Sequence, residues 1–182
     1  ERVEPAVKPY VKDITKYTMM PSSAIGRHVK VEERENRLKA DVETMNINRE
    51  ELNDLNLGVV CSGVVYQYVK DALPDASVFK IGTVYPMPIE AIRAFSKKVK
   101  RLVVIEELEP FFENQLKANG IVCEGKSIFS KLGEISVYDI KEKMLGEAKE
   151  LVKNDLPIRP PVMCAGCPHR GVFYVLKKLG LT

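Results

Sequence analysis

The sequence lacks the features that mark several classes of protein. No apolar run approaches the ~20 residues that a helix needs to cross a bilayer, and no signal-peptide pattern opens the chain. The net charge is only +3, with lysines and glutamates interspersed, so no basic face for nucleic acid is indicated. We therefore expect neither a membrane protein nor a nucleic-acid-binding protein.

Cysteine is also scarce. The four cysteines, Cys61, Cys123, Cys164 and Cys167, occur in a sequence without secretory signals. Reduced thiols in a cytoplasm fit this pattern better than a disulfide framework does. The sequence therefore predicts a cytoplasmic protein.

The overall composition is typical of a globular protein. The 182 residues are 45% hydrophobic and 29% charged, which suffices for one domain with a core and attached segments. The chain opens with Glu1 instead of methionine, and its most distinctive motif begins close to Thr182. We therefore expect it to be a piece of a longer protein.

Residues 1–51 predict an arm and a helix. Pro5, Pro9 and Pro21 interrupt any long helix, and residues 17–24 predict an extended segment. Within 31–45, apolar residues recur at intervals of seven, four and three among charged residues. This spacing predicts a helix with a narrow apolar stripe, which would lie along another surface.

Residues 52–140 alternate between expected strands and expected helices. The strands are expected at 57–61, 78–82 and 102–105, with two shorter ones at 121–123 and within 135–140; the helices are expected at 64–70, 89–98 and 110–118. Such alternation is typical of βαβ units with a parallel sheet. We therefore predict an α/β domain with a parallel, doubly wound sheet over 52–140.

The segment that follows predicts a connector and the start of another domain. Residues 141–154 are charged and predict a helix, and the proline-rich stretch 156–161 predicts a stiff linker. We therefore divide the remainder into a connector, 141–161, and a truncated C-terminal segment, 162–182.

Cys164 and Cys167 form a Cys-x-x-Cys pair, for which three chemistries are open. Zinc needs a second ligand pair about 15–20 residues away, and no cysteine follows; His169 is too close to replace a distant pair, although it could be a ligand. A thioredoxin-like redox pair normally follows a strand and opens a helix, whereas this pair follows prolines. An iron–sulfur cluster accepts such a pair as two of its four thiolates.

Two other sites lie where expected strands end. Ser62-Gly63 precedes an expected helix, at the kind of position where open α/β sheets bind ligands, but turn geometry at Gly63 explains it more simply. Glu106, Glu107 and Glu109 suggest a polar crevice, and we interpret them instead as acids at a helix N-terminus.

The flanks of the cysteine pair carry a family resemblance. Residues 160–171 resemble the Cys-Pro-Gly-Cys-Pro-His-Arg-Gly run of the alpha subunits of indolepyruvate–ferredoxin oxidoreductases, in the family of thiamine-dependent 2-oxoacid:ferredoxin oxidoreductases. The stretches 57–69, 105–113, 133–135 and 20–28 are similar to that family in the same order. The chain departs from the pattern at Ala165, where proline is usual, and both thiols remain.

This resemblance implies a domain organisation and a set of site residues. Residues 52–140 would be a transketolase C-terminal-like domain, the arm at 1–51 would trail from a pyrimidine-binding domain, and 162–182 would begin the domain that binds thiamine diphosphate. Cys164 and Cys167 would be metal ligands. Cofactor-binding candidates near the diphosphate are Gly166, His169 and Arg170.

The resemblance also implies an activity. The whole protein would carry out coenzyme A-dependent oxidative decarboxylation of indolepyruvate or another aryl 2-oxoacid, using thiamine diphosphate, Mg²⁺ and [4Fe–4S] clusters and passing electrons to ferredoxin. It would pair with a smaller beta subunit. The Gly-Asp-Gly type motif for magnesium diphosphate and the ferredoxin-like segment are absent from this sequence, so this fragment by itself is expected to be inactive.

An alternative of another class stays open. The chain could be a non-catalytic α/β assembly module whose cysteine pair binds zinc or nothing. Iron with acid-labile sulfide in the whole protein would separate the enzyme from this alternative. A related oxidoreductase acting on pyruvate or branched 2-oxoacids is a second enzyme hypothesis.

Overall fold

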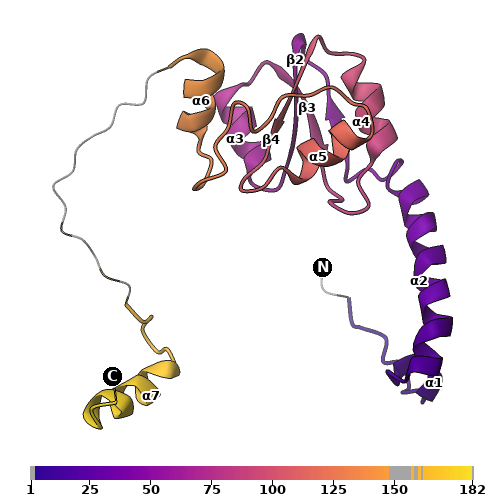
Figure 1. The fold of residues 1–182 in the computed structure, drawn as a ribbon, viewed down its shortest axis with the longest axis vertical. Helices are drawn as coiled ribbons and strands as arrows, with labels where there is room; N and C mark the ends of the chain where they lie inside the picture. The colour runs from indigo at the N-terminus through magenta and orange to yellow at the C-terminus, as the bar shows by residue number, and fades with distance from the viewer. Residues whose placement is uncertain (1–2, 148–156, 158–159, 161, 182) are drawn as a thin grey trace. The chain divides into compact units, whose positions relative to one another are not determined.

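The computed structural model describes residues 3–147, 157, 160 and 162–181. The chain divides into two compact units, Glu1–Lys149 and Glu150–Thr182. The described elements, in chain order, are α1 (Ile14–Tyr17), α2 (Pro21–Asp41), β1 (Arg49–Glu51), β2 (Asp54–Ser62), α3 (Val65–Ala72), β3 (Ala76–Ile81), α4 (Ile89–Ser96), β4 (Arg101–Ile105), α5 (Phe111–Ala118), α6 (Val137–Leu145) and α7 (His169–Lys178) (Figure 1).

A mixed four-stranded sheet forms the centre of the first unit. Its strand order is β1-β3-β2-β4, with β2 parallel to both β3 and β4. The predicted α/β fold with parallel strands is confirmed for these three. The sequence did not predict β1, which pairs antiparallel with β3 at the edge. Its residues, Arg49–Glu51, are all charged, so they carry none of the apolar signal of a buried strand.

Helices cover both faces of the sheet. Successive residues of β2 point to opposite faces, so neighbouring residues pack in different clusters. Val59 packs in the cluster that contains α3 and the α6 residue Ile140. Val60 packs in the cluster that contains α4 and the α5 residue Leu116. Figure 1 shows α3 and α6 on one side of the sheet and α4 and α5 on the other. The sheet is therefore doubly wound, and its switch point lies between β2 and β4.

Two short strands expected after residue 120 are not found. Residues 121–123 run beside β4, but only a single bridge forms there, between Val103 and Glu124. The strand expected within 135–140 is wrong, because residues 137–145 form α6. The side chain of Ser136 accepts from the Asp139 amide, and Asp139 closes the capping box. This local signal for a helix start outweighs the apolar residues around it.

The helix α2 begins at Pro21, ten residues before the predicted start at Val31. The extended segment predicted for 17–24 is therefore wrong at Tyr17, which ends α1, and from Pro21 onward, because proline is well tolerated in the first helical turn. With 21 residues, α2 is about 31 Å long. Its stripe residues Val31 and Leu38 remain 37% and 36% exposed among the described residues.

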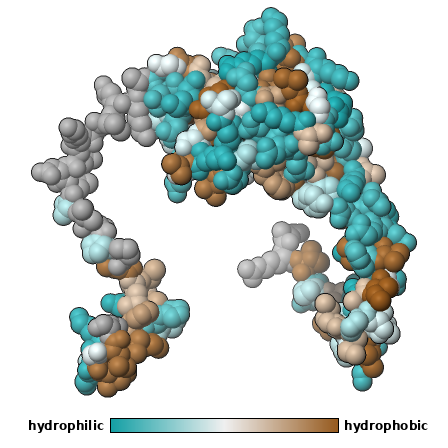
Figure 2. All heavy atoms as spheres, in the orientation of Figure 1, coloured by the Kyte–Doolittle hydropathy of each residue, from teal (hydrophilic) through white to brown (hydrophobic). Residues whose placement is uncertain are grey.

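The second unit contains α7. Four apolar residues, Val172, Val175, Leu176 and Leu179, recur at helical spacing along it, and most of them are exposed. Figure 2 shows apolar side chains gathered around this helix. Most of the predicted connector, including most of the proline-rich stretch, lies outside the described residues. Among the described helices, none combines the length and apolarity needed to span a membrane.

Candidate functional site

The cysteine motif of the second unit forms a tight turn. The amide of Cys167 donates to the carbonyl oxygen of Cys164 at 3.1 Å. Gly166, the third residue of the turn, has a φ of +76°. A type II turn requires such a left-handed residue at this position and favours proline at the second position, which Ala165 occupies here. Ala165 is compatible with the same turn, so the departure from the family pattern leaves the geometry of the motif in place.

The turn leads directly into α7. The amide of Arg170 donates to the carbonyl oxygen of Cys167 at 3.1 Å, and Pro168 is the N-cap. Cys164 is exposed and Cys167 is half-buried. The Sγ of Cys167 lies 3.5 Å from Nδ1 of His169. The structure therefore brings together two of the residues predicted to form the site, at the N-terminal end of a helix.

The other predicted residues lie at the same place without forming a closed site. Gly166 and Arg170 are exposed, and the Arg170 guanidinium has no partner among the described residues. No group of three or more histidine, cysteine, aspartate or glutamate side chains is gathered to hold a metal ion in the described part of the chain. The donor set fits a thiophilic metal, since two accessible thiols on one turn supply half of a four-thiolate set.

A second candidate lies in the first unit, where β2 and β4 end. The switch-point topology brings Ser62-Gly63 together with Glu106, Glu107 and Glu109 around an open hollow of about 400 Å³. Gly63 has a φ of +55°, so the interpretation that it serves a turn is confirmed. The sequence predicted polar groups at these strand ends but not that they would line one hollow.

The acids of this hollow are engaged in local structure. Glu106 is buried, and its carboxylate accepts from the amides of Phe112 at 2.8 Å and Glu113 at 3.0 Å. Burial raises the pKa of Glu106, and these two amides partly oppose the rise. The predicted role of Glu106 as an acid at a helix N-terminus is therefore confirmed. Glu109 pairs with Lys131 at 2.9 Å on the surface.

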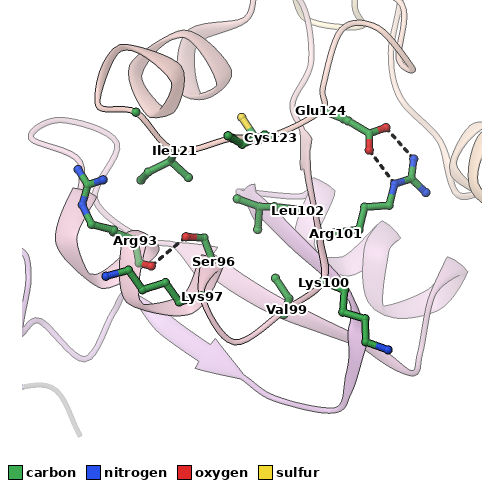
Figure 3. Close-up of a pocket in the computed structure, with 12 residues that line it drawn as sticks. Arg93, Ser96, Lys97, Val99, Lys100, Arg101, Leu102, Ile121, Cys123 and Glu124 are labelled. Carbon is green, nitrogen blue, oxygen red and sulfur yellow. Dashed lines mark hydrogen bonds and ion pairs between the residues drawn. The ribbon is translucent and has the colours of Figure 1, made fainter.

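A third hollow, of about 560 Å³, lies at the amino end of β4 (Figure 3). Three of the cations that line it are held by local partners. Arg101 makes two hydrogen bonds of 2.8 Å to the Glu124 carboxylate, and Arg93 donates to the carbonyl oxygen of Asn119. Lys100 donates to Asn56. The hollow is therefore better explained as the packing of helix ends than as a binding site for an anion.

The residues that attach α2 to the α/β core were not predicted from the sequence. Asn48 accepts from the Gly82 amide at 2.8 Å and donates to the Val42 carbonyl oxygen at 2.8 Å. Glu43 caps α4 by accepting from the amides of Glu90 and Ala91. No local signal could have identified these contacts, because most of the partners are more than thirty residues away.

Comparisons with known proteins agree with the motifs. No protein-family model matches the chain. The chain is 32% identical, over 96% of its length, to the indolepyruvate oxidoreductase subunit IorA of Methanothermobacter thermautotrophicus, of which it covers 32%. It is 28% identical, over 93% of its length, to the subunit of the same name from Thermococcus kodakarensis, of which it covers 30%.

A solved structure shares the fold. The chain superimposes on a 2-oxoglutarate:ferredoxin oxidoreductase from Magnetococcus marinus with a TM-score of 0.54 and 15% identity. The match covers 71% of this chain and 24% of that one. The chain spans about a third of the length of the curated relatives that it matches. The resemblance inferred from the motifs is thus confirmed: over nearly all of its length, this chain is related in sequence to the IorA subunit of indolepyruvate oxidoreductases.

Proposed function

We propose that this chain is part of a 2-oxoacid:ferredoxin oxidoreductase that performs the coenzyme A-dependent oxidative decarboxylation of indolepyruvate or another aryl pyruvate. The observation that carries the proposal is the similarity to IorA subunits over 93–96% of the chain. The activity is assigned to the whole protein, of which this chain supplies an α/β unit and the cysteine motif. A smaller beta subunit and ferredoxin are the proposed partners.

The proposal gives each part of the chain a role. Residues 52–140 are the transketolase C-terminal-like domain, preceded by an arm at 1–51 and followed by a connector at 141–161. Residues 162–182 begin the domain that binds thiamine diphosphate and Mg²⁺. When bound, thiamine diphosphate supplies the carbanion chemistry of the decarboxylation. This chain's own residues hold and orient the cofactors.

The motif residues carry the proposed cofactor contacts. Cys164 and Cys167 are ligands of an iron–sulfur cluster; the turn that holds both cysteines, one exposed and one half-buried, supports this role. Gly166, His169 and Arg170 lie near the diphosphate. The guanidinium of Arg170, which has no partner among the residues that the structure describes, and the positive end of the α7 dipole both favour a phosphate there.

Metal analysis separates the enzyme from the alternative, a non-catalytic assembly module with zinc or nothing at its cysteines. The complete subunit, purified without oxygen, should be brown and contain iron and acid-labile sulfide. Replacing both Cys164 and Cys167 by serine should remove the iron of one cluster, whereas the control Cys123→Ala, at a buried thiol, should leave it unchanged. A colourless protein that contains zinc and no iron would establish the alternative instead.

A further inference from the structure

Positive charge is concentrated in an open hollow at the N-terminal end of α2, where α1 lies (Figure 1). The hollow has a volume of about 700 Å³, and five cations and one acid line it: Lys16, Arg27, Lys30, Arg34, Arg37 and Asp13. These six side chains carry a net charge of +4, whereas the whole chain carries only +3. The charge of the whole chain, which indicates no basic face, therefore conceals a local one.

Most of these cations lie on one face of α2. They follow one another at intervals of three, four and three residues, at Arg27, Lys30, Arg34 and Arg37. Such spacing places them on the same side of a helix, over about 15 Å of its axis. The ion pairs within α2 involve other side chains, His28 with Glu32 and Lys39 with Glu35. None of the cations of the hollow forms an ion pair with another residue that the structure describes.

The acid of the hollow is already engaged in capping α1. The carboxylate of Asp13 accepts from the hydroxyl of Thr15 at 2.9 Å and from the amide of Lys16 at 3.0 Å. The hydroxyl residues Thr15, Ser22 and Ser23 line the same hollow. Guanidinium, ammonium and hydroxyl groups are the donors that proteins use to hold phosphates. The lining of this hollow therefore suits a phosphorylated ligand.

A second hollow adjoins the first and has aromatic walls. It has a volume of about 320 Å³, is lined by Tyr10 and Tyr17, and shares Asp13 and Lys16 with the basic hollow. Both rings are exposed, at 84% and 63%. Nζ of Lys16 lies 5.1 Å from the centroid of the Tyr17 ring, so cationic and aromatic groups meet there. Exposed rings beside cations suit a nucleotide, because its base can stack on a ring while its phosphates contact the cations.

We propose that these two hollows, together called the α1–α2 surface, bind a free nucleotide that carries two or more phosphate groups. The phosphates contact the cations of α2, and the base stacks on Tyr17 or Tyr10. Each hollow has a volume within the range of about 300–1,000 Å³ that is typical of small-molecule sites. The inference does not rest on the proposed oxidoreductase activity.

The distribution of charge favours a free nucleotide over a nucleic-acid strand. The chain carries +3 and the hollow +4, so the residues outside the hollow sum to −1. A strand binds through phosphate contacts along its length, and this chain offers no excess of cations beyond the hollow. Coenzyme A and nucleoside di- or triphosphates share the chemistry of a base with several phosphates, and a binding assay separates these two sources.

Equilibrium dialysis with the complete subunit and its smaller partner tests the proposal. Thiamine diphosphate and Mg²⁺ are present at saturation, so that the thiamine site does not take up a probe. The probes are ADP, coenzyme A, pyrophosphate and adenosine. We expect ADP or coenzyme A to bind about fivefold or more tightly than pyrophosphate, and adenosine to bind weakly, because only a nucleotide uses both hollows. The tighter of ADP and coenzyme A identifies the source of the ligand.

Variants assign the binding to this surface. Arg34→Gln should weaken the binding of ADP and of pyrophosphate alike by about tenfold, and Arg34→Lys, which keeps the charge, should lose less. Tyr17→Leu should weaken ADP binding by about fivefold and leave pyrophosphate binding unchanged, whereas Tyr17→Phe, which keeps the ring, should bind ADP normally. The matched control is Lys39→Gln, at a cation of α2 that pairs with Glu35 outside the hollow, and it should change none of these affinities. Circular dichroism checks that each variant is folded.

The contrary outcomes are equally definite. ADP affinity that is the same in the wild type, Arg34→Gln and Tyr17→Leu would overturn the proposal, as would adenosine binding as tightly as ADP. A short single-stranded oligoadenylate that binds more tightly than ADP and coenzyme A would overturn the assignment to a free nucleotide. Viologen reduction is measured on the same protein: if reduction proceeds and nucleotide binding fails, only this inference is lost, and the reverse result removes only the proposed function.

Discussion

Gly63 directly follows β2 at the switch point, and substitutions there offer a quantitative test of the fold. Its φ is +55°, and no atom lies within 4 Å of the position that a Cβ would take. A Cβ at this position would therefore meet no steric clash, and backbone strain is the main cost of substitution. For an L-residue in the left-handed region that strain is about 1–2 kcal/mol.

The structure predicts a ranked series at this position. Gly63→Asn should cost about 0.5 kcal/mol or less, since asparagine tolerates the left-handed region. Gly63→Ala should cost about 1 kcal/mol and Gly63→Val about 2 kcal/mol, because β-branched residues resist this conformation most. For a domain of this size, each kcal/mol lowers Tm by about 2–4 °C.

Urea denaturation followed by circular dichroism measures the series. Gly26→Ala is the matched control: Gly26 also has free space around it, but it lies inside α2 with ordinary helical φ. Alanine there should not destabilise the protein, because it is the better helix former by about 1 kcal/mol. An asparagine variant as unstable as the valine variant, or a valine variant as stable as the wild type, would refute the reasoning.

Three further changes test how the first unit is held together. Asn48→Ala removes the bonds that join the end of α2 to the loop after β3 and should lower the free energy of unfolding in urea by about 2–3 kcal/mol; a loss below about 0.5 kcal/mol would contradict this. Glu43→Ala removes the cap of α4 and should cost about 1 kcal/mol, unlike the conservative Glu43→Gln, which should cost less; no loss of stability in Glu43→Ala would show that the cap contributes nothing. The hydrogen bond from Tyr66 lowers the pKa of Glu51 below its usual 4.5. The stabilisation that this hydrogen bond provides is therefore fully present above pH 4.5 and is lost as the pH falls through the lower pKa that Glu51 has in the folded state. Glu51→Gln should flatten the acid side of the stability profile, and an unchanged slope would argue against the pairing.

Local patterns predicted the elements that have strong apolar signals. The runs that became β2, β3 and β4 are buried on both faces, so their sequences are almost continuously apolar. The strand β1 could not be predicted in this way, because its charged residues pair with β3 at the edge. The capping signal at Ser136 and the tolerance of helix starts for Pro21 were both present in the sequence, and they outweigh the apolar spacing around them in the folded chain.

The candidate site also has one part that local sequence predicts and other parts that depend on the folded chain. The Cys164–Cys167 turn follows from the motif itself, since glycine at the third position favours a turn that holds the two cysteines together. The contact of His169 with Cys167 depends on where α7 begins, which is a property of the folded chain. The hollow between β2 and β4 depends on strand order, which no local pattern encodes.

Anaerobic viologen reduction by the complete subunit with its smaller partner tests the proposed function most directly. The assay contains thiamine diphosphate, Mg²⁺, coenzyme A and a panel of aryl, branched and simple 2-oxoacids. The account predicts reduction with aryl pyruvates that requires coenzyme A. No reduction with any 2-oxoacid, by protein shown to carry its iron and thiamine diphosphate, would contradict it.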